Sequence, residues 1–114
     1  MATIYHNPRC SKSRQTLELI KNQNIEPKIV LYLETPLSAQ TISSLLEKLG
    51  ISARQLLRKG EQAYKDQHLA DANLTEMQLI DAMVKFPKLI ERPIVVAGKQ
   101  AIIGRPPELV LEIL

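Results

Sequence analysis

The apolar and polar positions in the first third of the chain alternate between a strand-like and a helical pattern. Residues 2–6 form a short β-like run, and residues 12–23 place apolar side chains near one helical face, with Asn24 as the expected stop. Residues 28–33 form a second apolar run bounded by turn-forming residues. Strand, helix and strand in this order predict a βαβ unit with parallel strands and a right-handed crossover.

The middle of the chain has the period of amphipathic helices. The clearest helix begins at its expected cap, Ser38, carries apolar residues at i, i+3, i+4 and i+7, and ends at Gly50. Residues 52–59 predict a shorter helix closed by a glycine, and residues 61–67 predict another turn or two.

A last amphipathic helix is expected over residues 76–85, between its cap Thr75 and the helix breaker Pro87. The apolar residues expected to face inward from it are Met77, Ile80, Met83 and Val84. We interpret such stripes as core.

The C-terminal part returns to strands. Residues 93–96 and 101–103 predict an antiparallel hairpin, and residues 108–113 predict a closing helix with proline in its first turn. The whole order, βαβ, helical insertion and ββα, predicts an α/β protein with a mixed four-stranded sheet, of which the thioredoxin-like fold is the best-known form. The length of 114 residues, with no linker or repeat, predicts a single domain over residues 1–114.

Charge and composition indicate which kinds of partner the protein binds. The net charge of +3 is spread along the chain, without the concentrated basic stripe and stacking aromatics of a nucleic-acid binder, so small anions are the better match. No apolar run approaches the ~20 residues that span a bilayer, and no signal core follows Met1. We therefore expect no nucleic-acid or membrane partner and a cytoplasmic location.

Cys10 is the only cysteine, which excludes an intramolecular disulfide and an all-cysteine metal site. The two histidines, His6 and His68, lie far apart in sequence, so no metal is expected. A cysteine-phosphatase loop needs arginine six positions after the cysteine, where Thr16 stands. A dithiol oxidoreductase needs a second cysteine at the position of Ser13.

The position of Cys10 favours its thiolate form. It lies between the first strand and the first helix, where free backbone N–H groups and the helix dipole attract an anion. Arg9, Lys12 and Arg14 add positive charge nearby, and Ser11 is the expected helix cap. Such surroundings lower the pKa of a cysteine, so Cys10 is a candidate nucleophile at neutral pH.

The run Ile4-Tyr5-His6-Asn7-Pro8-Arg9-Cys10, followed by Ser13-Arg14, resembles the nucleophile loop of the glutaredoxin-coupled arsenate reductase (ArsC) family. The likeness continues in order across nearly the whole chain, in the blocks Leu31-Tyr32-Leu33-Glu34, Leu56-Leu57-Arg58-Lys59, Glu91-Arg92-Pro93-Ile94-Val95 and Gly104-Arg105-Pro106. Arg9 and Lys12 depart from the family pattern by adding cations. The resemblance implies a thioredoxin-like fold, in agreement with the order of elements.

The resemblance also implies an activity. A cysteine thiolate attacks arsenate, and glutathione and glutaredoxin resolve the covalent adduct and release arsenite, so glutathione is a co-substrate and no cofactor is bound. The matching positions are Cys10 as nucleophile, Arg58, Arg92 and Arg105 as oxyanion ligands, His6 and Ser13 as residues that favour the thiolate, and Asn7 and the cis-proline Pro93 as structural residues of the site.

The chemistry of the arginines suits this role, because thiolate and arsenate are both anions and repel each other unless fixed cations neutralise them. Arginine stays charged and its planar fork holds two oxygens at once. Arg92 and Arg105 flank the predicted hairpin and are expected near Cys10, whereas Arg58 rests on the resemblance. Two alternatives stay open: an Spx-like regulator that binds RNA polymerase, which Ser13 disfavours, and a glutathione-linked thiol exchanger without an oxyanion substrate.

Overall fold

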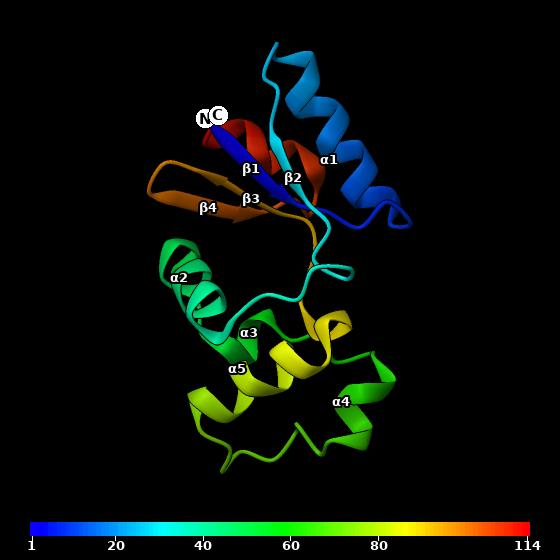
Figure 1. Ribbon diagram of the computed structural model, residues 1–114, viewed down its shortest axis with the longest axis vertical. Helices are drawn as coiled ribbons and strands as arrows, with labels where there is room; N and C mark the ends of the chain where they lie inside the picture. Colours follow the sequence, from blue (N-terminus) through cyan, green and yellow to red (C-terminus); the bar gives the residue numbers. More distant parts are fainter. The chain divides into compact units, whose positions relative to one another are not determined.

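The computed structural model describes residues 1–114, whose contacts form two compact units (Figure 1). The first unit combines the two ends of the chain, Met1–Thr35 and Arg92–Leu114. The second unit is the continuous segment Pro36–Glu91. The expectation of one domain over residues 1–114 stays a prediction.

The first unit contains a four-stranded sheet. Its strands are β1 (Ala2–Tyr5), β2 (Lys28–Val30), β3 (Ile94–Ala97) and β4 (Gln100–Ile103). They lie in the order β2-β1-β3-β4, with β1 parallel to β2 and antiparallel to β3, and with β3 antiparallel to β4. The helix α1 (Ser11–Asn22) forms the crossover between β1 and β2. The mixed sheet predicted from the sequence is therefore confirmed.

Apolar residues of four elements form the core of this unit. Ile4 of β1, Ile20 of α1, Val95 of β3 and Val110 are completely buried against one another. Val110 belongs to the closing helix η2 (Pro107–Glu112), which is a 3-10 helix and not the α-helix expected over residues 108–113. Through these side chains α1 and η2 both pack against the central strands β1 and β3.

The strand predicted over residues 28–33 is shorter in the structure and ends at Val30. Its partner β1 ends at Tyr5, and the last bond of the ladder runs from the His6 N–H to the Val30 oxygen at 2.9 Å. Beyond that point the chain turns, with the N–H groups of Glu34 and Thr35 both donating to the Leu31 oxygen. The strand β2 therefore ends before the apolar run does, because its partner strand β1 has no further residues to pair with it.

The second unit is helical. Its helices are α2 (Ala39–Leu49), α3 (Ala53–Leu56), α4 (Gln62–Asp66) and α5 (Glu76–Lys85), followed by the 3-10 turn η1 (Pro87–Leu89). The predicted cap Ser38 accepts a hydrogen bond from the Thr41 N–H, and Gly50 ends α2 with φ of 69°. Thr75 caps α5 as expected. None of these helices, nor α1, is long and apolar enough to cross a bilayer.

Two details of the helical prediction are wrong. The helix expected over residues 52–59 ends at Leu56, because Leu57 becomes extended and forms a β-bridge with Ile90. Met77, expected to face inward from α5, is 55% exposed, and Leu79 is buried in its place. Two residues turn a helix by about 200°, so Met77 and Leu79 lie on nearly opposite sides.

Candidate active site

The loop before α1 is a tight turn organised by Asn7. Its backbone oxygen accepts from the Cys10 N–H at 3.0 Å, and its side-chain Oδ1 accepts from the Arg9 N–H, also at 3.0 Å. Asparagine followed by proline is typical of such turns. The Arg14 guanidinium also donates to the Pro8 oxygen at 2.9 Å. These bonds fix the backbone that carries the cysteine.

Cys10 itself occupies the N-cap position of α1, with φ of −95° and ψ of 123°. The sequence-based expectation that Ser11 caps this helix is therefore wrong, since Ser11 is the exposed first residue of the helix. The sulfur consequently lies where the unpaired N–H groups of the first helical turn point.

These surroundings determine the acidity of the thiol. Burial of Cys10 raises its pKa, but the backbone N–H groups of Ser13 and Lys12 and the guanidinium of Arg92 lower it by more. The net result is a pKa below the ordinary value for cysteine, which favours the thiolate at neutral pH. Since the residue is 9% exposed, only a small part of it is open to solvent.

Two arginines from the other end of the chain reach the sulfur. The Arg105 Nη2 donates to the Cys10 Sγ at 3.5 Å, and Arg92 donates a hydrogen bond to the same sulfur. Arg92 and Arg105 lie at the start and end of the β3–β4 hairpin, as the sequence predicts. The guanidinium groups that contact the sulfur are these two, whereas Lys12 acts on it through its backbone N–H.

His6 and Ser13 form a buried pair beneath the loop. The His6 Nδ1 lies 2.6 Å from the Ser13 Oγ, which also accepts from the Asn7 N–H at 3.1 Å. Burial, followed by the nearby charges of Lys21 and Arg14, lowers the pKa of His6. The imidazole is therefore neutral at neutral pH and brings no positive charge to Cys10. Its contact positions Ser13, whose backbone N–H stabilises the thiolate.

The cis peptide bond implied by the resemblance is present at Arg92–Pro93, and a second one, not expected, is at Arg105–Pro106. Sequence reasoning also missed the packing of Gly104. A Cβ there would lie 2.6 Å from the Thr16 Oγ1 and 2.9 Å from the Pro93 Cγ. Only glycine lets the end of β4 approach α1 this closely, directly before Arg105. The signal for it in the sequence is a glycine at the end of a predicted strand.

Arg58 belongs to the helical unit. Its Nη1 donates to the Glu91 Oε1 at 2.9 Å, and its backbone N–H donates to the Leu89 oxygen at 2.8 Å. Both contacts hold it beside the segment that follows η1. Its role as an oxyanion ligand stays a prediction.

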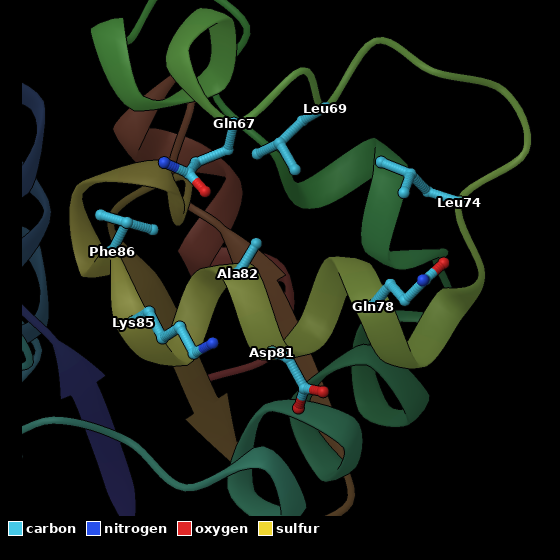
Figure 2. A pocket seen from close by; sticks show the side chains of 8 residues that line it. All are labelled: Gln67, Leu69, Leu74, Gln78, Asp81, Ala82, Lys85 and Phe86. Atoms are coloured by element: carbon cyan, nitrogen blue, oxygen red, sulfur yellow. The ribbon is translucent and has the colours of Figure 1, made fainter.

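The helical unit also contains a hollow of about 280 Å³ beside α5, which Figure 2 shows with its lining side chains. Its apolar wall is formed by Leu69, Leu74, Ala82 and Phe86, and its polar residues are Gln67, Gln78, Asp81 and Lys85. It has no cysteine, histidine or arginine, so it offers neither a nucleophile nor a guanidinium for an oxyanion. No group of three or more His, Cys, Asp or Glu side chains in the structure is arranged to hold a metal ion.

Comparison with known proteins places these features in context. Residues 5–113 match the model of the ArsC family. A protein of Escherichia coli K12 named uncharacterized protein YfgD is 62% identical over 96% of this chain and 93% of its own. An Escherichia coli protein named arsenate reductase is 51% identical over 98% of this chain and 79% of its own. The solved structure of arsenate reductase from Vibrio cholerae has a TM-score of 0.97 at 51% identity, covering 99% of this chain and 97% of that one.

Proposed function

The chain belongs to the ArsC family, and from this premise we propose that it is an arsenate reductase in which Cys10 is the nucleophile. The observation that carries the proposal is the single sulfur at the N-terminus of α1, in contact with the Arg105 guanidinium and with a lowered pKa. A thiolate held beside fixed cations is the arrangement that an attack on an oxyanion requires.

The first chemical step is a substitution without a change of oxidation state. The Cys10 thiolate attacks the arsenic, a sulfur–arsenic bond forms, and one arsenic–oxygen bond breaks as its hydroxyl takes up a proton from solvent and leaves as water. Arg92 and Arg105 neutralise the charge of the entering anion and of the transition state. Arg58 is proposed as the third guanidinium for the oxyanion, on the strength of its match to the family pattern.

The neighbouring residues serve the nucleophile in this scheme. Ser13 favours the thiolate through its backbone N–H, and His6 holds the Ser13 side chain. Asn7 keeps the turn closed by accepting the Cys10 N–H. Pro93 lies against Gly104, between the two arginines in sequence, and fixes the backbone near them.

The second stage is the reduction, and its electrons come from outside the chain. Because the protein has one cysteine, it cannot form an internal disulfide. We propose that glutathione and glutaredoxin supply the thiols: one arsenate and two glutathione molecules give one arsenite, one glutathione disulfide and one water. Arsenic gains two electrons and the two thiol sulfurs lose them. The reducing thiol pool that this requires is cytoplasmic.

The test is an assay of arsenate-dependent NADPH consumption with glutathione, glutaredoxin and glutathione reductase. Turnover is expected with the wild-type chain and is expected to vanish in Cys10→Ser. The matched control is Lys99→Gln, which removes an exposed charge at the far end of the β3–β4 hairpin and keeps full activity. Absence of arsenate turnover in the wild type, with retained reduction of a glutathione mixed disulfide, would instead identify a thiol exchanger.

A further inference from the structure

A hollow lies behind the nucleophile loop in the first unit. It has a volume of about 260 Å³ and is lined by residues 6–9 of the loop and by Leu31, Leu33 and Glu34. Its walls are therefore the turn that leads into Cys10 and the segment that follows β2. The Cys10 N–H donates to the oxygen of Asn7, a lining residue, so the nucleophile and this hollow share one turn.

The hollow carries opposite charges that the fold does not use. The Arg9 guanidinium and the Glu34 carboxylate belong to exposed residues of its wall, and neither makes a hydrogen bond or an ion pair within the chain. Leu31 and Leu33 provide the apolar part of the wall. One cation and one anion on an apolar surface complement a small zwitterion, whose carboxylate pairs with arginine and whose ammonium pairs with glutamate.

The chemistry of the nucleophile requires a visiting thiol. Cys10 has no second cysteine in the chain to resolve an adduct, so the thiol of another molecule must reach the adduct on its sulfur. Arg9 precedes Cys10 directly, and consecutive Cα atoms are about 3.8 Å apart. A ligand held on Arg9 therefore lies on the residue next to the nucleophile.

We propose that this hollow binds glutathione, with a carboxylate of the tripeptide on Arg9 and its α-ammonium group on Glu34. The inference rests on the proposed function for the need of a reducing thiol, but its evidence is the hollow and its two unused charges. It also gives a role to Arg9, a cation beside the nucleophile whose guanidinium has no partner in the fold.

The test uses S-methylglutathione, which keeps the charges of glutathione but has no free thiol. Titration into isotope-labelled protein is expected to shift the backbone amide signals of Arg9, Leu33 and Glu34. Loss of one ion pair in Arg9→Gln or Glu34→Gln is expected to weaken binding about fivefold. The matched controls are Lys28→Gln and Glu26→Gln, which remove exposed charges of the same unit outside the hollow. Thermal unfolding of each variant verifies that it is folded.

Unchanged affinity in both the Arg9 and the Glu34 variant, or shifts confined to another surface, would overturn the inference. Binding that depends on Arg9 and Glu34 in a protein that does not reduce arsenate would support the inference and refute the proposed function. Where arsenate is turned over, both variants should raise the KM for glutathione about fivefold and leave the KM for arsenate unchanged. Turnover with an unchanged KM for glutathione would contradict the inference alone.

Discussion

Arg105 donates a hydrogen bond from its Nε to the backbone oxygen of Arg92, with 2.7 Å between the two atoms. The same guanidinium donates from Nη2 to the Cys10 sulfur. One planar side chain thus orders the backbone of the other arginine and stabilises the thiolate. A point charge such as lysine cannot make both contacts in fixed directions.

Arg105→Lys is therefore expected to weaken the site although the charge is retained. The pKa of Cys10 should rise, because a hydrogen bond to the thiolate is lost. The rate of Cys10 alkylation by iodoacetamide, measured against pH, reports this as a midpoint shifted to higher pH. A lost hydrogen bond to a charged group is worth about 1.5–3 kcal/mol, so kcat/KM for arsenate should fall roughly tenfold or more. An unchanged alkylation profile would show that Arg105 does not act on the sulfur.

Ser13→Ala is expected to destabilise the fold. The Ser13 Oγ is the partner of both the Asn7 N–H and the His6 Nδ1, and all three groups are buried. Removing it leaves these groups unsatisfied and should lower the free energy of unfolding by about 1–3 kcal/mol in urea titration. Ser11→Ala, two residues earlier on the exposed face of the first turn, is the control and should change stability little. Equal effects of the two substitutions would refute this assignment.

The stability of the protein is expected to fall in mild acid because of His6. Its pKa is lowered in the fold by burial and by two nearby cations, whereas the unfolded chain takes up the proton at about pH 6.5. The unfolded state thus binds more protons as pH falls below about 6.5, and unfolding becomes easier down to the folded pKa. Urea titrations across this range should show a smaller loss in His6→Gln. The control His68→Gln retains His6 and should keep the wild-type slope.

Gly104→Ala is expected to lower the stability of the protein and the reactivity of Cys10. The added Cβ would press on the Thr16 side chain and on the Pro93 ring, so β4 must move away from α1. Overpacking of this kind costs about 1–3 kcal/mol, and the shift should reduce Cys10 reactivity because Arg105 follows directly. Gly60→Ala is the matched control, since nothing lies within 4 Å of a Cβ there. Equal melting temperatures for the two variants would contradict this packing.

Much of the fold could be predicted because its signals are local. A capping hydroxyl such as Ser38, the left-handed glycine Gly50 and the 3.6-residue period of α2 act within one element. The position of Cys10 before a helix is equally local, and so is its dependence on backbone N–H groups. These features need no knowledge of which distant segments meet.

What could not be predicted depends on tertiary neighbours. The end of β2 is fixed by the length of β1, and the sequence of β2 carries no sign of it. Likewise, Arg9 is adjacent to Cys10 in sequence but lines the hollow behind the loop, and Arg105 from the other end of the chain donates to the sulfur. The sequence suggested that Arg9 acts on the sulfur because it is adjacent to Cys10, but the guanidinium groups that contact the sulfur are those of Arg92 and Arg105.

The origin of these contacts has a consequence for the newly made chain. Arg105 is separated from Cys10 by 95 positions, and the first unit is completed only when the segment beginning at Arg92 is added. A ribosome adds about 5–20 residues per second, so for several seconds the nascent polypeptide exposes a cysteine without its guanidinium partners. Until then the thiol has only the backbone N–H groups of the first helical turn to lower its pKa, and it acquires its full reactivity once Arg92 and Arg105 have been added.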